Sequence, residues 1–112
     1  MSQKSNRIRL SGADAFNGAF AGRKIATADL VFYFRPNGSV EGRVGLVVGR
    51  KAYAGAVTRN LLKRRLRALY RHSVAAMRGF DVVIVARRGR KEPGFAALEG
   101  QVRKLAVALE GK

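Results

Sequence analysis

Residues 56–78 read AVTRNLLKRRLRALYRHSVAAMR, and this stretch decides the fold because it joins an apolar stripe to a dense run of cations. At about 100° per residue, it predicts a long helix whose one arc carries large apolar side chains. That arc holds Leu62, Leu66, Leu69, Tyr70 and Met77. A neighbouring arc holds Asn60, Lys63, Arg64, Arg67, Arg71 and Arg78. One side of the helix is therefore predicted to pack on a sheet, while the adjacent side stays open to a partner.

The segments around this helix predict strands and two further helices. Upstream, residues 24–27 and 30–35 are short β-type runs, and 36–39 (Pro-Asn-Gly-Ser) is turn chemistry that predicts a hairpin with a returning strand at 43–49. Downstream, residues 81–86 are continuously apolar, which predicts a central strand buried on both faces. A basic loop at 87–93 leads to a last helix at 94–110.

The N-terminal region is predicted to be a basic extended arm, residues 1–10, followed by a helix. Ser11 is its expected N-cap, with Asp14 three residues on, and Gly22 is expected to end it. The resulting order is αβββαβα around a sheet of about four strands. We predict a small α+β or α/β sandwich, with residues 1–112 forming a single domain because the length fits one core.

The charge balance points to a polyanionic partner. The 112 residues include 23 Lys or Arg and 7 Asp or Glu, a formal net charge of +16, while 47% hydrophobic residues predict a packed core. Between Glu41 and Asp81 there is no acidic residue. A solvated helix face normally mixes signs, since like charges at i, i+3 and i+4 destabilise a helix. The cationic arc is therefore predicted to bind nucleic-acid phosphates. Asn60 is either a reader of base edges or 2′-hydroxyls, or a local hydrogen-bonding group at the helix start.

The aromatic residues divide between core and surface. Phe32 and Phe34 alternate with Tyr33 along a strand, so a core position for the first two leaves Tyr33 available to stack on an unpaired base. Phe16 and Phe20 share a helix face, and both core packing and ligand contact remain open for them. Gly45, inside a predicted strand, indicates a bulge or a close backbone approach.

Several classes of protein are disfavoured. There is no cysteine, His72 is the single histidine and is expected on a helix surface, and the acidic residues are scattered, which argues against a protein-encoded metal or hydrolytic site. No apolar run reaches the roughly 18 residues that span a bilayer, and the N-terminus lacks a signal-peptide core. We expect a cytoplasmic protein without a membrane partner.

Residues 53–67 resemble the signature of the bacterial ribonuclease P protein subunit. An aromatic residue is followed by Ala three places later, by Arg-Asn after three more, and then by Lys-Arg, an aliphatic residue and a basic residue. The matching positions are Tyr53, Ala56, Arg59, Asn60, Leu62, Lys63, Arg64, Leu66 and Arg67. The segment 43–51 and the early Arg7, Phe16, Phe20 and Gly22 extend the resemblance over about residues 7–110. Leu61 departs from it, since a basic residue is common there.

The resemblance implies a function and a site. In that family the catalyst is a large RNA, which holds most of the required Mg²⁺. The protein is its small cofactor, and one protein is expected per RNA. The complex removes the 5′ leader of precursor tRNA, so no catalytic residue is expected in the protein. The implied RNA-binding residues are Arg50, Lys51, Arg59, Asn60, Lys63, Arg64, Arg67 and Arg71, and the implied leader cleft is Phe16, Phe20 and Tyr33. The contacts of the loop at 52–58 do not transfer, because that loop varies in the family.

The resemblance also implies a left-handed crossover from the strand at 43–49 through the long helix to the strand at 81–86, where general rules favour the right-handed form. The main alternative function is a structural RNA-binding protein of ribosomal type, from which the Arg-Asn-x-x-Lys-Arg arrangement separates the chain. A nucleoid-type DNA-binding protein and a free-standing protein nuclease are further alternatives.

Overall fold

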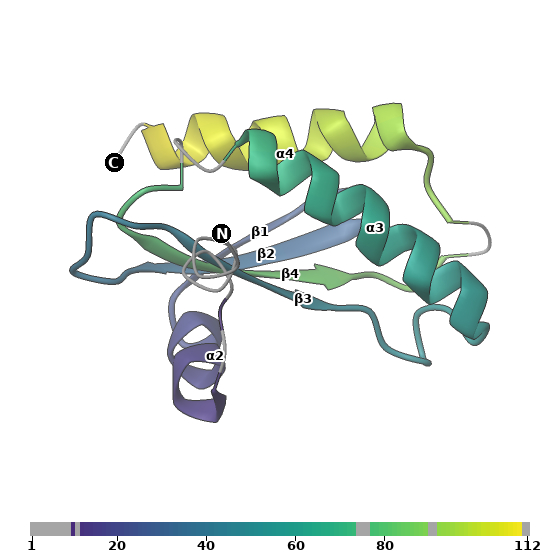
Figure 1. Ribbon diagram of the computed structural model, residues 1–112, viewed down its shortest axis with the longest axis horizontal. Coiled ribbons are helices and arrows are strands. Elements are labelled where there is room, and N and C mark those ends of the chain that lie inside the picture. The colour runs from purple at the N-terminus through teal and green to yellow at the C-terminus, as the bar shows by residue number, and fades with distance from the viewer. Residues whose placement is uncertain (1–9, 11, 74–76, 90–91, 111–112) are drawn as a thin grey trace, which may run out of the picture.

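A computed structural model of the chain describes residues 10, 12–73, 77–89 and 92–110. Its elements follow the predicted order: α2 (Ala13–Phe20), β1 (Arg23–Ala26), β2 (Leu30–Pro36), β3 (Arg43–Val47), α3 (Ala56–His72), β4 (Phe80–Ala86) and α4 (Phe95–Glu110). The four strands form one sheet, with α3 and α4 on one face and α2 on the other (Figure 1). The predicted arm at residues 1–10 and the predicted N-cap Ser11 lie outside the described residues, apart from Leu10. The N-cap position of α2 is occupied by Gly12, with a positive φ of 90°.

The strand order is β1-β2-β4-β3, which confirms the run at 81–86 as a central strand and shows that the predicted hairpin is wrong. β2 pairs antiparallel with β1 and β4, whereas β3 pairs with β4 in parallel. The physical reason is that β4 is apolar on both faces and takes the interior place between β2 and β3. The turn residues instead carry the chain past the first residue of β4, where the amide N–H of Asn37 donates to the carbonyl of Gly79 at 2.8 Å.

β3, α3 and β4 form a βαβ unit, because two parallel neighbouring strands need a long crossover connection. The predicted left-handed sense of this crossover stays a prediction.

The main core lies between the sheet and the two long helices, on what we call the helical face. Leu30, Phe32 and Phe34 point into it from β2, and α3 and α4 contribute apolar stripes. These stripes are Leu62, Leu66, Leu69 and Tyr70 on α3, and Leu98, Val102, Leu105 and Leu109 on α4. The opposite side, the α2 face, holds only a small buried cluster of Leu10, Ala19 and Val83 within the described part of the chain.

The long helix ends earlier than predicted, at His72 rather than at residue 78. Met77 and Arg78 lie in a turn that leads directly into β4. Gly79 takes a positive φ of 79°, and the amide N–H of Phe80 donates to the carbonyl of Met77 at 3.1 Å. The side chain of Met77 is buried in the core from this turn. Its spacing from Leu69 and Tyr70 therefore continues the helical pattern, although residue 77 is not part of the helix.

Two polar networks join the strands to neighbouring segments: one links β3, β4 and the turn at Asn37, and the other links α4 to the segment between β1 and β2. Arg43 donates two hydrogen bonds of 2.8 Å to the buried carboxylate of Asp81, which also accepts one of 3.0 Å from Asn37. On α4, the buried Gln101 donates to the carboxylate of Asp29 at 2.7 Å, and its amide oxygen accepts from the Thr27 hydroxyl. These bonds satisfy polar groups that would otherwise be costly to bury.

Candidate nucleic-acid interface

The outer side of α3 presents a surface that we call the basic face, made of Asn60, Lys63, Arg64, Arg67 and Arg71. The apolar stripe of the same helix packs into the core, which directs these side chains outward. Four of the five are exposed and Lys63 is half-buried. No member has a hydrogen bond or ion pair with a residue that the structure describes. The structure thus gathers the predicted side chains, except Arg78, on one unneutralised face.

Asn60 lies exposed within this face. Its alternative role, a local hydrogen bond at the helix start, is not formed to any residue in the described ranges. The amide is therefore available to a partner together with the neighbouring cations.

Arg59 and Arg65 differ from the basic face because their guanidinium groups already bind backbone carbonyls. Arg59 donates to the carbonyls of Tyr53 at 3.1 Å and Ala54 at 2.6 Å, which ties the loop before α3 to the helix. Arg65 donates to the carbonyl of Pro93 at 2.8 Å, which ties α3 to the segment before α4. These structural roles were not predicted, since nothing in the spacing distinguishes these arginines from their neighbours.

Arg50 and Lys51 are exposed in a turn between β3 and α3. The turn is closed by the amide N–H groups of Ala52 and Tyr53, which both donate to the carbonyl of Gly49 at 3.1 Å. The Tyr53 ring is buried in the main core, which anchors the turn from below. Burial raises the pKa of the Tyr53 hydroxyl, and the nearby charges of Asp29 and Glu92 raise it further. Arg50 and Lys51 are therefore held on a fixed turn near the start of α3.

Phe16, Phe20 and Tyr33 all lie on the α2 face, and we call them the aromatic cluster. Tyr33 points to the opposite side of the sheet from Phe32 and Phe34, as predicted. The rings of Phe20 and Tyr33 make an edge-to-face contact with centroids 4.8 Å apart, and Phe20 is 40% exposed. The contact therefore leaves aromatic surface open to a ligand.

Phe16 is both packed and partly exposed. Its ring lies over Gly45, where an added Cβ would come within 2.5 Å of Phe16 Cζ. The sequence left a bulge or a close approach open at Gly45, and the structure shows a close approach by this ring. Gly45 thus provides the space that holds Phe16 against the sheet next to the other two aromatic residues.

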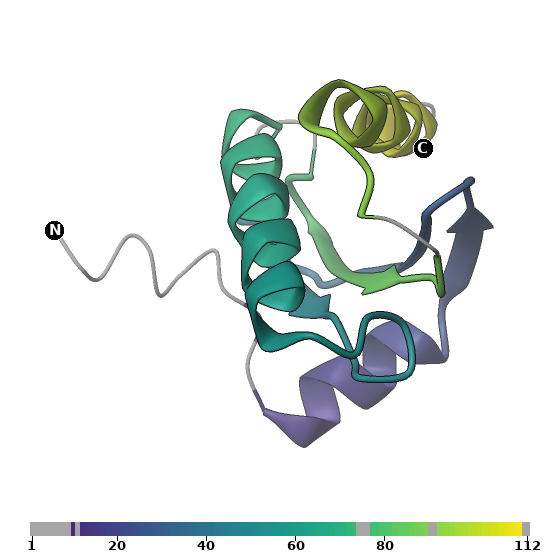
Figure 2. The ribbon, with the colours of Figure 1, turned by 90° about the vertical axis from the view of Figure 1, so that its right-hand side faces the viewer.

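The basic face and the aromatic cluster come from different sides of the sheet. In Figure 2, α3 lies beside the β3 edge, α2 lies below the sheet, and β1 forms the far edge. Sequence reasoning missed two cations on the α2 face next to Tyr33. Lys24 is its direct partner on β1 and Arg35 follows it by two residues on β2, so strand alternation could have identified both.

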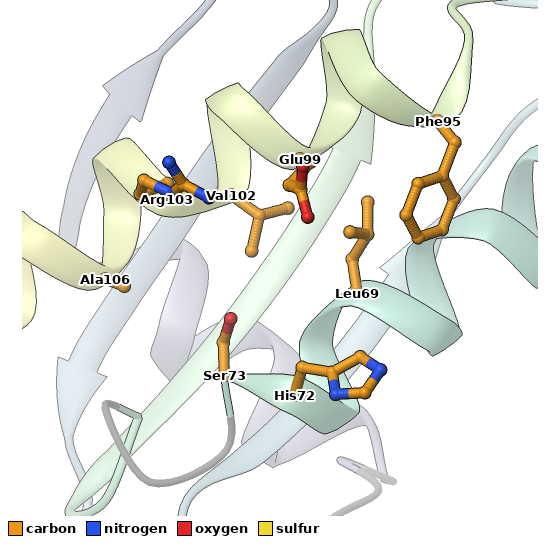
Figure 3. A pocket seen from close by; sticks show the side chains of 8 residues that line it. All are labelled: Leu69, His72, Ser73, Phe95, Glu99, Val102, Arg103 and Ala106. Atoms are coloured by element: carbon orange, nitrogen blue, oxygen red, sulfur yellow. The ribbon is translucent and has the colours of Figure 1, made fainter.

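A hollow of about 200 Å³ lies between α3 and α4 (Figure 3). Its lining is Leu69, His72, Ser73, Phe95, Glu99, Val102, Arg103 and Ala106. His72 lies exposed on the helix surface, as predicted. The hollow includes the acidic Glu99 and no residue of the basic face, so we do not count it in the nucleic-acid interface.

Within the described ranges, no three or more His, Asp or Glu side chains gather as ligands for a metal ion. No helix in the same part of the chain has the length and apolar character needed to cross a membrane.

The sequence model of the Ribonuclease P family matches residues 5–110, a range that contains α3, its basic face and the aromatic cluster. The chain belongs to the Ribonuclease P family. The ribonuclease P protein component of Pseudomonas paraeruginosa is 37% identical over 99 residues, which cover 87% of this chain and 73% of that protein. The resemblance to the bacterial ribonuclease P protein subunit that the sequence indicates is therefore confirmed.

Solved ribonuclease P proteins share the fold. The ribonuclease P protein from Thermotoga maritima, in complex with 1-(4-fluorophenyl)-2-thiourea, aligns with a TM-score of 0.78 and 31% identity, over 88% of this chain and 96% of that one. A Staphylococcus aureus ribonuclease P protein mutant aligns with a TM-score of 0.84 over 96% of this chain and 92% of its own, and at 23% identity it supports the fold alone. The αβββαβα order with a four-stranded mixed sheet is therefore the architecture of ribonuclease P proteins.

Proposed function

We propose that this chain is the protein subunit of a ribonuclease P, which binds the catalytic RNA and the 5′ leader of precursor tRNA and assists removal of the leader. The observation that carries the proposal is the unneutralised basic face of α3 in a chain of the Ribonuclease P family. The structural RNA-binding alternative is disfavoured because the family match covers residues 5–110.

The basic face is proposed to dock on the catalytic RNA. Its arginines offer bidentate donors for phosphate oxygens, and Asn60 adds an amide that can read a base edge or a 2′-hydroxyl. Arg50 and Lys51 extend the same positive field from the turn before α3. Arg59 binds loop carbonyls through one terminal nitrogen, and the remaining donors of its guanidinium group are proposed to reach the RNA. This positive surface reduces the repulsion between two polyanions, the catalytic RNA and its substrate.

The aromatic cluster is proposed to hold the single-stranded leader. Unpaired bases stack on aromatic rings, and the exposed part of Phe20 next to Tyr33 provides such a surface. Only a precursor carries a leader, so a contact made with the leader favours the precursor over mature tRNA. Phe16, which lies over Gly45 on β3, is proposed to extend this aromatic surface toward the α3 side.

Hydrolysis of the phosphodiester bond is assigned to the catalytic RNA, with one protein per RNA. Mg²⁺ is proposed to be held by RNA phosphates in the complex. The described residues of the protein do not fit a metal centre of their own, since they offer no cluster of three or more acidic or histidine side chains. The proposed contribution of this chain is the binding and orientation of RNA.

The decisive experiment mixes the protein with a bacterial ribonuclease P RNA at low Mg²⁺ and measures 5′ processing of a precursor tRNA. We expect strong stimulation over the RNA alone. Binding without stimulation would favour the structural RNA-binding alternative, and neither binding nor stimulation would reject both.

The role of the basic face is tested by Arg64→Ala and Arg67→Ala. Each should weaken assembly with the catalytic RNA and reduce the slope of log affinity against log salt by about one unit, as expected for one lost phosphate contact. Arg103→Ala, an equal charge change on the exposed surface of α4, is the matched control and should leave the slope unchanged. An unchanged slope in the α3 variants would remove both residues from the phosphate interface.

A further inference from the structure

Two cations that the aromatic cluster does not include lie beside it on the β1–β2 edge of the sheet. Lys24 pairs with Tyr33 across the two strands, so both side chains project from the α2 face. Arg35 follows Tyr33 by two residues and shares this face. Its guanidinium group lies against α2 at Gly18, where it leaves no room for a Cβ. Arg35 therefore lies between α2 and the sheet edge, beside the aromatic cluster.

These cations are not neutralised within the described part of the chain. The nearest acidic position along the pairing is Asp81, the β4 partner of Arg35. Its carboxylate is fully buried and already accepts hydrogen bonds from Arg43 and Asn37. Lys24 and Arg35 are both exposed and have no ion pair with a described residue. Their charge is available to an anion.

A hollow of about 610 Å³ lies at this corner of the sheet, and Arg35 is one of its lining residues. Its lining comes from residues 21–23 and 34–36 and from Phe80. Phe34 and Phe80 form an edge-to-face pair with centroids 6.2 Å apart, and Arg23 contributes a second guanidinium group. Phe34 is only 3% exposed, so the aromatic surface of this hollow comes from the half-buried Phe80. An aromatic ring beside two guanidinium groups suits a nucleotide, whose base is apolar on its faces and whose phosphate is anionic.

The strand order indicates the order in which a bound RNA strand would reach these features. α3 lies beside β3, and β1 is the far edge of the sheet (Figure 2). The aromatic cluster lies between them on the α2 face, with Phe16 over β3 and Tyr33 on β2. The distance from β3 to β1 is three strand spacings, roughly 14 Å. A single strand that leaves the α3 side and crosses the aromatic cluster reaches Lys24 and Arg35 last.

We propose that Lys24, Arg35 and the hollow beside Arg23 form a distal subsite for single-stranded RNA, which binds the part of the leader farthest from the cleavage point. This proposal rests on the proposed function, because it assumes that the leader crosses the aromatic cluster. The distal subsite makes binding depend on leader length, since a short leader ends before it reaches β1.

The experiment measures Kd for the reconstituted holoenzyme with precursor tRNAs whose leaders are lengthened one nucleotide at a time. Lys24→Gln and Arg35→Gln are compared with Lys104→Gln and Arg103→Gln, which remove the same charges from α4. In the first pair, Kd for long leaders should rise roughly three- to five-fold, as for exposed ion pairs. The salt slope should fall by about 0.7 for each lost contact with a single strand. Short leaders and mature tRNA should bind as they do to the wild-type protein.

The proposal is overturned if the Lys24 and Arg35 variants behave like the α4 variants at every leader length, or if they lose affinity equally for long leaders, short leaders and mature tRNA. Failure of the wild-type chain to stimulate processing would instead overturn the proposed function. If Arg35→Gln lowers Tm because its contact with Gly18 is lost, Lys24→Gln on the exposed edge strand decides the result alone. Arg35→Lys, which keeps the charge, should retain most of the length dependence.

Discussion

The two faces of the sheet differ in how completely they are covered. On the helical face, α3 and α4 bury Leu30, Phe32 and Phe34 to 3% exposure or less. On the α2 face, a helix of 8 residues covers part of the sheet and leaves Phe20 40% exposed. Among the residues that the structure describes, one face of the sheet is closed by two helices and the other is covered only in part.

This difference separates stability from recognition. Burial of apolar surface stabilises the fold by about 25 cal/mol per Å², and most of that surface lies on the helical face. The α2 face forgoes some of this stabilisation and keeps aromatic and cationic side chains accessible to RNA. A substitution on the helical face should therefore lower stability, whereas one at an exposed side chain of the α2 face should mainly lower affinity.

The largest expected effect is that of Phe32→Ala on the helical face. The ring is fully buried, so its removal should lower the free energy of unfolding by about 3–5 kcal/mol in a denaturant titration. Phe20→Ala, the same change on the α2 face, should cost less than about 1 kcal/mol because the ring is already partly solvated. Equal losses would show that the two faces contribute alike to stability.

Gly45→Ala should affect both stability and binding. The new Cβ would lie 2.5 Å from Phe16 Cζ and 2.7 Å from Phe16 Cε1, so the ring must move. We expect a loss of about 1–3 kcal/mol in unfolding free energy, together with weaker precursor binding. Gly49→Ala is the control, since a Cβ there meets no atom within 4 Å. If the two variants unfold alike and bind precursor alike, Phe16 does not depend on the space at Gly45.

Phe20→Ala should reduce affinity for precursor tRNA by about 1–3 kcal/mol, the usual contribution of one stacked base, and leave affinity for mature tRNA unchanged. Phe95→Ala on α4 is a matched control, because the two rings are 40% and 44% exposed. Tyr33→Ala should behave like Phe20→Ala, since the two rings are in contact. Binding titrations with both tRNA forms test this, and equal losses for the two forms would assign the rings to packing.

The smallest effect is expected from Tyr53→Phe. The buried hydroxyl has no hydrogen-bond partner among the described residues, so its removal should be neutral or should stabilise the fold by up to about 1 kcal/mol at neutral pH. Burial raises the pKa of this hydroxyl in the folded state, so above about pH 10 the unfolded chain loses the proton first and stability falls. Thermal unfolding at rising pH should show a smaller alkaline decline in Tyr53→Phe. A steeper decline, or a marked loss at neutral pH, would show that the hydroxyl is bound in the folded protein.

Much of the site could be predicted because it depends on local periodicity. The stripe from Leu62 to Tyr70 and the basic face beside it follow from the helical repeat, and the outward direction of Tyr33 follows from strand alternation. The end of α3 could not be predicted, because the buried Met77 continues the apolar spacing from within a turn. The roles of Arg59 and Arg65 also escaped prediction, since each depends on a carbonyl that the fold brings near the guanidinium group.

The sequence by itself determined the order of the elements, the two-sided character of α3, the central nature of β4 and the excess of positive charge. These properties depend on the spacing of neighbouring residues, which every local segment carries with it. Only the tertiary structure decided that β4 separates β2 from β3 and that Phe16 rests on Gly45. Such pairings join segments far apart in the chain, and packing of the whole core selects among the partners that local patterns allow.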